Sequence, residues 1–397
     1  MARPWLTIIG IGEDGPEGLS AASRDALSRA DVVAGAARHL ALLGEIGPKG
    51  WVWPVPFADG VEQILAMRGR QVVVLASGDP FWFGAGSLFA ERLQPGEWVA
   101  HPGISVFALA TSRLGWRLED VTCLGLHASS LARIRPHLAA GSRLLVTLRN
   151  GAAVTELGGI VTDLGFGSTM LSVMEALGGP REKVRTVRAD GEVPEAIAAP
   201  VLVAIDTAGG SAMPLAPGLR DDLFEHDGQI TKRPVRALTV AALAPRHGEM
   251  LWDIGAGSGS VAIEWLLRHP SLGAIALEAN SDRFARIARN AMALGVDRLR
   301  VISGTAPEAL AGLPLPDAVF VGGGGDEALL QALWALLPVG TRLVANAVTL
   351  ESEALFAAWQ ARVGGELLRI ELAEAVALGG KRGWRAAYPV VQWSVMR

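Results

Sequence analysis

Three alternating glycines between two acidic residues form the clearest chemical pattern in the sequence. Gly255, Gly257 and Gly259 follow an apolar run that contains Asp253, and Glu278 ends the next apolar run. Glycines after a strand let the backbone approach a ligand closely, and the amides of a following helix point toward it. The acid at the head of the turn can meet the ammonium group of an amino-acid tail, and Glu278 can accept both hydroxyls of a ribose.

This combination favours S-adenosylmethionine (SAM) over a dinucleotide. The dinucleotide fingerprint is G-x-G-x-x-G, whereas the spacing here is G-x-G-x-G, and an acid is poorly placed beside a pyrophosphate. A glycine-rich turn that serves only tight packing is the competing interpretation.

A literal G-x-G-x-x-G motif does occur near the start, as GIGEDG at residues 10–15. Taken alone it indicates NAD or FAD, and therefore an oxidoreductase. Glu13 and Asp14 would place like charge beside an anionic phosphate, which argues against this interpretation.

Strands and helices must alternate to position these residues. In the second half we expect strands at 249–254, 273–278, 298–303, 317–321 and 340–346, helices at 258–268, 281–294, 326–336 and 350–362, and extended segments at 366–378 and 386–396. The first half has strand-like runs at 5–12, 71–80, 143–150 and 201–206. The pattern predicts an α/β protein with largely parallel sheets, finished by an antiparallel hairpin. A Gly-, Pro- and Ala-rich stretch at 208–220 is the expected linker between domains 1–207 and 221–397.

Composition excludes several function classes. The net charge is −4 and neither half has a positive excess, so we expect no nucleic-acid partner. The single Cys123 excludes an intramolecular disulfide, and we interpret it as a buried neutral thiol. No apolar run is long enough for a membrane span, so we expect a cytoplasmic protein. The seven histidines lack metal-binding spacing, so we expect no metal.

The first half resembles the tetrapyrrole methylase family. The motifs are GIGEDGPEGLS (10–20), ASGDPFWFGAG (76–86) and HPGISVFALA (101–110). The resemblance implies a dimeric fold of two α/β lobes with SAM in the cleft between them. It implies cofactor-binding roles for Gly78, Asp79, Pro80, Phe83, Gly103, Ile104 and Ser105. Gly10 and Gly12 would lie nearer the tetrapyrrole.

The second half is similar to the class I SAM-dependent methyltransferases that methylate C15 of a precorrin and decarboxylate one acetate. The motifs are DIGAGSGSVAIEW (253–265), ALEAN (276–280), GTAPEAL (304–310), DAVFVGGGG (317–325) and VANAVTLES (344–352). The resemblance implies that the cofactor is held by Asp253, Gly255, Gly257 and Glu278, with Gly304, Thr305 and Ala306 beside the adenine. Many members have Asp where Thr305 stands, which puts one adenine contact in question.

Together the halves resemble the fused, bifunctional precorrin methyltransferases of aerobic cobalamin biosynthesis. That family methylates C5 and C15 of a precorrin-6 intermediate and decarboxylates its ring C acetate to give precorrin-8. The resemblance implies two SAM sites per chain, a tetrapyrrole substrate and a homo-oligomer, and it alone assigns each carbon to one half. An oxidoreductase, an RNA methyltransferase on the class I fold and a non-catalytic corrinoid-binding protein are the alternatives.

A substrate with many carboxylates requires cations in its site. The glycine-flanked turn GGKRGWRAAY (379–388) offers Lys381, Arg382 and Arg385, and a solvated hairpin tip is the competing interpretation. Gly323 and Gly324 follow a strand at the ligand-binding edge, where the backbone would pass close to the transferring methyl. Methyl transfer to an activated carbon needs alignment more than a base, so we expect no dedicated catalytic acid or base.

Overall fold

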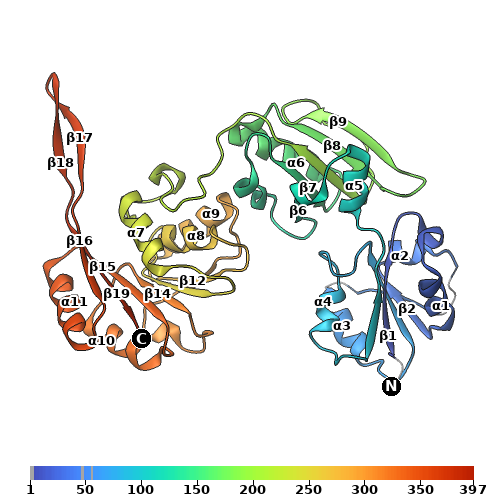
Figure 1. Cartoon of the computed structure of the whole chain (residues 1–397), viewed down its shortest axis with the longest axis horizontal. Helices are drawn as coiled ribbons and strands as arrows, with labels where there is room; N and C mark the ends of the chain where they lie inside the picture. Colours follow the sequence, from blue (N-terminus) through green and yellow to red (C-terminus); the bar gives the residue numbers. More distant parts are fainter. Residues whose placement is uncertain (1–3, 46–48, 55–56) are drawn as a thin grey trace. The chain divides into compact units, whose positions relative to one another are not determined.

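The chain divides into two compact units. The computed structural model describes residues 4–45, 49–54 and 57–397. Unit 1 comprises Met1–Leu131 and His137–Ser211, and unit 2 comprises Ala132–Pro136 and Ala212–Arg397 (Figure 1). Residues 132–136 thus group with unit 2, which the sequence did not suggest. No helix among the described residues is long and apolar enough to cross a membrane.

The first lobe of unit 1 is a parallel sheet in the order β3-β2-β4-β1-β5. Its strands are β1 (Leu6–Ile11), β2 (Val32–Gly35), β3 (Gly50–Val52), β4 (Val72–Ser77) and β5 (Trp98–His101). Its helices are α1 (Ala21–Arg29), α2 (Ala37–Leu42), α3 (Phe57–Leu65) and α4 (Gly86–Ala90). Ile8 packs into one apolar cluster and Ile9 into another, so both faces of the sheet are covered and the strands are almost continuously apolar.

The second lobe of unit 1 departs from the expected parallel arrangement. Its sheet has the order β6-β7-β10-β8-β9, and only β6 and β7 are parallel. The elements are α5 (Val106–Leu114), β6 (Thr122–Gly125), β7 (Arg143–Leu148), α6 (Ala152–Val161), β8 (Met170–Glu175), β9 (Lys183–Arg188) and β10 (Val201–Asp206). The expectation of largely parallel sheets is wrong here, because the short 176–182 connection can join only antiparallel neighbours. Burial raises the pKa of the half-buried Cys123 thiol on β6 to about 11, so the thiol is neutral.

Unit 2 contains a seven-stranded sheet in the order β13-β12-β11-β14-β15-β19-β16. Its strands are β11 (Met250–Ile254), β12 (Gly273–Glu278), β13 (Arg300–Ser303), β14 (Ala318–Val321), β15 (Arg342–Ala347), β16 (Glu366–Ile370) and β19 (Val390–Met396). Strands β11 to β15 are parallel, and β19 runs antiparallel between β15 and β16. The expected parallel sheet with an antiparallel end is confirmed.

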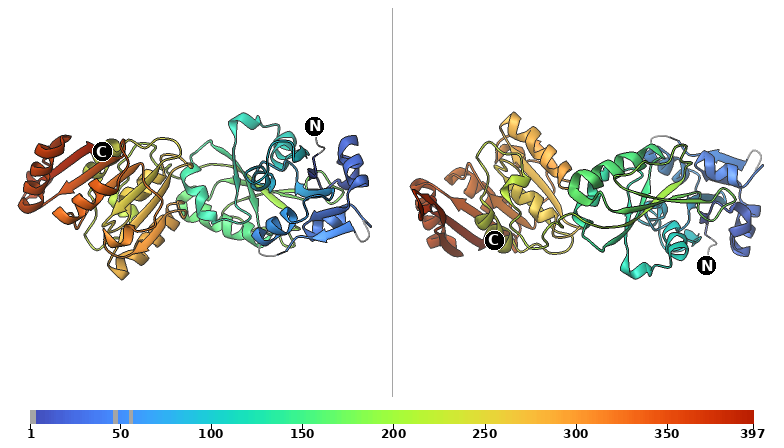
Figure 2. Two further views of the ribbon diagram at one scale, coloured as in Figure 1. Left: turned by 90° about the horizontal axis from the view of Figure 1, so that it is seen from below. Right: turned by 90° about the horizontal axis from the view of Figure 1, so that it is seen from above.

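Helices cover both faces of this sheet (Figure 2). They are α7 (Arg233–Leu243), α8 (Ser260–Leu266), α9 (Ser281–Ala293), α10 (Glu327–Leu336) and α11 (Leu350–Val363). Leu251 packs with α7, α8 and α9, whereas its neighbour Trp252 packs with α10 and α11. The alternation of side chains along β11 therefore divides the interior into two cores.

Residues 379–388 do not form the expected turn. Lys381–Ala386 is a strand, β18, which pairs with β17 (Ala373–Leu378) as a separate two-stranded ribbon that extends from the sheet (Figure 1). Leu378 lies opposite Lys381, so only Gly379 and Gly380 make the turn, and Gly379 has a φ of 59°. A glycine pair suits a two-residue hairpin, and this tight turn lets strand pairing continue into the basic segment.

A buried ion pair joins helix α7, near the start of unit 2, to helix α8. Arg236 of α7 and Glu264 of α8 are both fully buried, and Arg236 Nε donates to Glu264 at 2.5 Å. Arg236 also donates to Asp221 and to the Leu219 carbonyl, while Glu264 accepts the amides of Gly218 and Leu219. Both charged groups of the pair therefore also form hydrogen bonds with residues 218–221, the segment that precedes α7.

Replacing Glu264 by alanine should destabilise unit 2 by about 3–5 kcal/mol, because a buried guanidinium loses its carboxylate. Hydrogen exchange of β11 and α8 amides in urea would measure the loss. The control is Glu353→Ala, which breaks the exposed pair with Arg369 and should cost less than about 1 kcal/mol. Equal effects of the two substitutions would contradict the stated role.

Candidate functional sites

In unit 2, the loops after β11 and β14 meet where the strand order reverses. Gly255 has a φ of 68°, and a Cβ there would lie 2.6 Å from the Gly323 carbonyl oxygen. The Gly322 amide donates to the Ile254 carbonyl at 3.0 Å. Gly255 and Gly323, expected on the cofactor and substrate sides respectively, therefore touch. Such a switch point is where open α/β sheets bind ligands.

Asp253 lies beneath this turn and is 1% exposed. Its Oδ2 accepts the Ala262 amide at 3.0 Å, while its buried Oδ1 has no hydrogen-bond partner among the described residues. Burial, with a smaller contribution from the Glu278 charge, raises the pKa of Asp253 to about 7. The carboxylate is thus poised to gain a cationic partner.

Glu278 closes the other side of the turn. It accepts the Gly257 amide at 2.8 Å and the Asn280 amide at 2.9 Å, which leaves lone pairs for a diol. The Gly304 amide donates to the Glu278 carbonyl at 3.2 Å, so the loop after β13 begins beside Glu278. Thr305 and Ala306 follow directly, and Ala306 packs against the apolar core.

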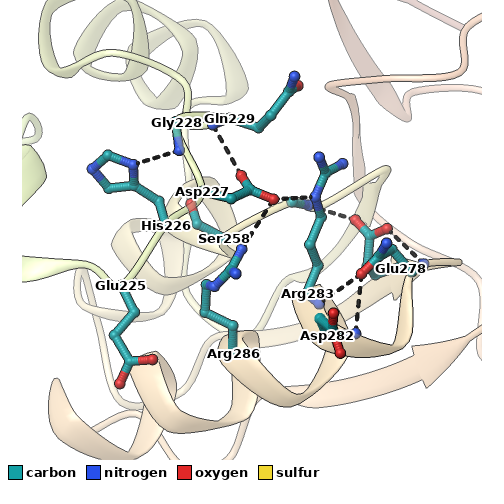
Figure 3. Close-up of polar contacts among 12 residues, drawn as sticks. Glu225, His226, Asp227, Gly228, Gln229, Ser258, Glu278, Asp282, Arg283 and Arg286 are labelled. Atoms are coloured by element: carbon teal, nitrogen blue, oxygen red, sulfur yellow. Dashed lines mark hydrogen bonds and ion pairs between the residues drawn. The ribbon is translucent and has the colours of Figure 1, made fainter.

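The segment 225–230 also lies against the turn, although the sequence did not single it out. It precedes α7, which begins at Arg233. Asp227 accepts from Arg283 at 2.8 Å and lies 3.2 Å from Arg286, both on α9 (Figure 3). These contacts hold the pKa of Asp227 well below its ordinary value. The sequence signal that could have indicated this contact is the spacing of Arg283, Arg286 and Arg289, which places three cations on one face of a helix.

Asn290 fixes this segment to the glycine turn. Its amide nitrogen donates to the carbonyls of Ser258 and Glu225, and its oxygen accepts the Glu225 amide. The hydroxyl of the buried Ser258 has no partner among the described residues, as is true of Asp253 Oδ1. Two partnerless oxygens in a glycine-lined turn fit a ligand that brings hydrogen-bond donors, as the amino-acid tail of SAM does.

In unit 1, three strand-end loops meet through glycine. A Cβ on Gly10 would lie 1.8 Å from the Gly78 carbonyl oxygen and 2.3 Å from the Gly103 amide nitrogen. The Gly103 amide donates to the Gly78 carbonyl at 3.0 Å. The structure therefore brings Gly10, expected near the tetrapyrrole, beside Gly78 and Gly103, expected near the cofactor.

The loop after β4 presents a strained aromatic residue. Phe83 has a φ of 56° and is 52% exposed, and a Cβ on Gly125 of the second lobe would lie 2.7 Å from its ring. A positive φ in a bulky residue is held only where the surroundings fix it, and such strain concentrates at functional sites. Phe83 thus stands at the junction of the lobes.

The remaining predicted residues of this site lie in the same loops. Asp79 accepts the Phe81 amide, and Pro80 is buried. Ile104 is 67% exposed, and the Ser105 hydroxyl caps α5 by accepting the Ala108 amide.

The GIGEDG loop does not have the geometry of a dinucleotide site. It runs into a short 3₁₀ helix (Gly15–Gly18), and no α-helix begins until Ala21. A Cβ on Gly12 would lie 2.5 Å from the Asp14 carboxylate, which occupies the space beside the loop. A pyrophosphate requires a helix N-terminus at this point, so the oxidoreductase interpretation lacks support.

The basic residues of the ribbon lie apart from the glycine turn. Lys381, Arg382 and Arg385 are exposed on β18, and Arg385 pairs with Glu374 of β17 at 3.4 Å. No described contact joins them to the loops after β11 and β14. Gly324, by contrast, lies in the exposed loop after β14, next to Gly323. The described residues contain no group of three or more His, Cys, Asp or Glu side chains arranged to hold a metal.

Comparisons with known proteins match each half separately and the chain as a whole. Residues 5–191 match the tetrapyrrole (corrin/porphyrin) methylases, and residues 222–397 match the precorrin methyltransferase domain. A precorrin-6Y C(5,15)-methyltransferase (decarboxylating) from Sinorhizobium sp. is 49% identical, covering 99% of this chain and 97% of that protein. The chain belongs to this family. The protein of the same name from Mycobacterium tuberculosis is 40% identical, covering 99% of this chain and all of that protein.

A solved structure is similar to part of the chain. The C-terminal domain of the precorrin-6Y C5,15-methyltransferase from Rhodobacter capsulatus is 56% identical, covers 47% of this chain and all of that domain, and has a TM-score of 0.45. The family resemblance expected from the sequence motifs is confirmed by the full-length relatives, and SAM is the methyl donor that a methyltransferase family implies.

Gly10→Ala should abolish cofactor binding in unit 1, because the added carbon would meet two backbone groups that cannot move aside. Calorimetry with S-adenosylhomocysteine (SAH) on the full chain would count the sites lost. Gly159→Ala is the control, since a Cβ there meets nothing within 4 Å. If the Gly10 variant still binds two SAH molecules, the contact among Gly10, Gly78 and Gly103 is not part of the cofactor site.

Asp253→Asn should weaken SAH binding in unit 2 by about 10- to 100-fold, because a charge-assisted contact is lost. In the wild type, affinity should fall as the pH drops through 7, since protonation removes the charge that an ammonium requires. The raised pKa also means that the stability contributed by neutral Asp253 is complete below about pH 4 and lost as the pH rises through 7.

Calorimetry from pH 6 to 8 tests the asparagine variant, whose affinity should be independent of pH. Asp317→Asn, which alters a carboxylate that accepts the Met250 amide at the other end of β11, should leave affinity unchanged. A pH slope that persists in the Asp253 variant would contradict the assignment.

Proposed function

We propose that this chain is a cytoplasmic, bifunctional SAM-dependent methyltransferase of cobalamin biosynthesis with two cofactor sites. It methylates C5 and C15 of a precorrin-6 intermediate and decarboxylates the ring C acetate, which leaves a methyl group, to give precorrin-8. The observation that carries this proposal is the presence, in each unit, of glycine-lined loops that meet at the carboxyl ends of parallel strands. Family membership supplies the chemistry that such sites support.

We assign C15 methylation and decarboxylation to unit 2 and C5 methylation to unit 1. The match of residues 222–397 to the precorrin methyltransferase domain supports the first assignment. A cobalt-precorrin-6B C(15)-methyltransferase (decarboxylating) from Salmonella typhimurium is 31% identical over 179 residues, which is 92% of that protein but 43% of this chain. The name of this relative, which is about the size of one unit, thus includes only the C15 methylation and the decarboxylation.

In unit 2, SAM when bound supplies an electrophilic methyl group, and this chain supplies its position. Asp253 and Ser258 offer partnerless oxygens to the amino-acid tail, and Glu278 offers its carboxylate to the ribose hydroxyls. Gly323 and Gly324 keep the approach beside Gly255 free of side chains. Alignment of donor and acceptor at about 3–3.5 Å then carries most of the catalysis, with no dedicated base required.

In unit 1, Gly78, Gly103 and the loop that ends in Phe83 hold the cofactor, and Gly10 and Gly12 face the substrate. Phe83 together with the exposed Phe81, Trp82 and Ile104 forms an apolar surface suited to a macrocycle. Loss of the acetate carboxyl group as CO₂ in unit 2 requires an electron sink for the pair left on the remaining carbon, which the conjugated substrate itself provides until that carbon is protonated to a methyl group.

We also propose that the enzyme is a homo-oligomer. Among the described residues no third strand pairs with the ribbon of β17 and β18, and Leu378, Trp384 and Tyr388 on or beside it are 68%, 78% and 88% exposed. A two-stranded ribbon is at best marginally stable alone, and exposed aromatic groups favour burial against another surface. Lys381, Arg382 and Arg385 lie on this ribbon, and we retain them as substrate-binding candidates in an assembled enzyme.

The wild-type chain should bind two SAH molecules and Gly10→Ala should bind one, while Asp253→Asn should bind one tightly and a second about 10- to 100-fold more weakly. With the precorrin substrate and SAM at a concentration that fills only the tight site, Asp253→Asn should retain one methyl transfer without loss of CO₂. Under the same conditions Gly10→Ala should retain one methyl transfer with loss of CO₂. Mass spectrometry of the products distinguishes these outcomes. A wild-type stoichiometry of one, or loss of CO₂ by the Asp253 variant only, would overturn the division of labour.

A further inference from the structure

Two arginines from different lobes of unit 1 share a single carboxylate. Arg38 donates to Glu13 Oε1 at 2.8 Å, and Arg181 donates to Glu13 Oε2 at 3.0 Å. Glu13 lies in the loop after β1, Arg38 in α2 directly after β2, and Arg181 in the loop between β8 and β9. The Glu13 side chain is 9% exposed, whereas those of Arg38 and Arg181 are 42% and 60% exposed.

Arg38 is also tied to the strand that leads into the cofactor loop. Its guanidinium donates to the hydroxyl of Ser77, the last residue of β4 and the neighbour of Gly78. The same hydroxyl lies 3.0 Å from His39 Nε2. Because arginine can only donate, the Ser77 hydroxyl accepts from Arg38, and it also contacts the His39 ring. Burial lowers the pKa of His39 to about 3, so this ring is neutral and adds no charge.

The cluster carries one more cation than anion. Two guanidinium groups meet one carboxylate, and His39 is neutral. Of the other acids in these loops, Glu182 pairs with Arg113 at 2.6 Å, Asp79 accepts a backbone amide, and the Asp14 carboxylate lies beside Gly12 and Gly18. In the part of the chain that the structure describes, no recorded ion pair joins any of the three to Arg38 or Arg181. Among the described residues, Glu13 is the hydrogen-bond partner recorded for Arg181, which leaves most of its five donors directed to solvent.

The position of the cluster indicates a ligand rather than only a connection between lobes. It lies at the carboxyl edge of the parallel sheet, next to the glycine contact, where ligands of open α/β sheets bind. The loops are already joined through backbone: a Cβ on Gly179 would lie 2.5 Å from the Glu13 carbonyl oxygen. Contact between the lobes therefore does not depend on Arg181.

We propose that Arg38 and Arg181 bind a peripheral carboxylate of the tetrapyrrole in unit 1, with Glu13 orienting the two guanidiniums. This inference rests on the proposed function, because it takes the substrate to be a polycarboxylate macrocycle. A planar guanidinium binds a carboxylate through two parallel hydrogen bonds, so the pair selects for an acetate or propionate arm at a fixed place on the ring. The surplus positive charge is neutralised when the arm arrives.

The test uses the full-length enzyme with Arg181→Gln, Arg181→Lys and the control Arg188→Gln, which removes an exposed arginine of β9 paired with Asp190. Arg181→Gln should raise the KM for C5 methylation about tenfold, which corresponds to about 1.4 kcal/mol, and change kcat less than about twofold. Arg181→Lys should raise the KM less than Arg181→Gln does, since lysine keeps the positive charge but lacks the planar guanidinium that forms two parallel hydrogen bonds. SAH affinity should remain at the wild-type value in all three.

A stable porphyrin octacarboxylate, titrated by absorbance, tests binding independently of turnover. Arg181→Gln should weaken its binding about tenfold while Arg188→Gln does not, and the octamethyl ester should not show this dependence on Arg181. Unchanged porphyrin affinity in Arg181→Gln, or a parallel loss of SAH affinity that marks a purely structural role, would overturn the inference. Arg181-dependent porphyrin binding by an enzyme that fails to methylate C5 would instead support the carboxylate site and overturn the proposed function.

Discussion

Close approach of backbone to backbone at strand ends is the constraint on which both sites depend. In unit 1 the carbonyl of Gly78 occupies the space that a Cβ of Gly10 would need, and in unit 2 the carbonyl of Gly323 does the same for Gly255. The glycines thus set how near the loops come to each other, and through that distance they define the shape of the surface offered to a ligand.

Charge is distributed differently around the two glycine contacts. In unit 2 an acid with a raised pKa lies buried below the turn, and an acid–arginine cluster of Asp227 with α9 fixes the covering segment. In unit 1, Glu13 forms ion pairs with Arg38 and Arg181, and the neighbouring His39 is neutral. The first arrangement suits a cationic ligand group, and the second suits an anionic one, as expected where a cofactor tail and a substrate carboxylate are bound.

Local patterns predicted much of the fold. The strand at 273–278 was placed correctly, and the helix at 281–294 was placed to within a residue, because apolar periodicity and the Asn280 cap are encoded locally. The glycines that make close backbone contacts, such as Gly10 with Gly78 and Gly255 with Gly323, were also singled out from the sequence, and their ligand-binding roles stay predictions. The antiparallel pairing of the second sheet and the ribbon of β17 and β18 were not, because strand partners depend on contacts that no short window contains.

The charged contacts beside these loops were missed for the same reason. Glu13 and Arg181 are separated by 168 residues, and Asp227 and Arg283 by 56. Each looks like an ordinary surface charge until the fold brings its partner within 3 Å. Lys381, Arg382 and Arg385, in contrast, form a conspicuous cluster in the sequence, yet the structure places them on an exposed ribbon.

The buried pair of Arg236 and Glu264 sets where unit 2 begins. Family similarity starts at residue 222, but Glu264 draws both of its backbone donors from Gly218 and Leu219. A fragment starting at residue 221 would therefore leave a fully buried carboxylate without two hydrogen bonds, although no residue of the recognised domain had been removed. An excised second unit would need to start before Gly218, so that part of what looks like a linker belongs to the interior of the domain.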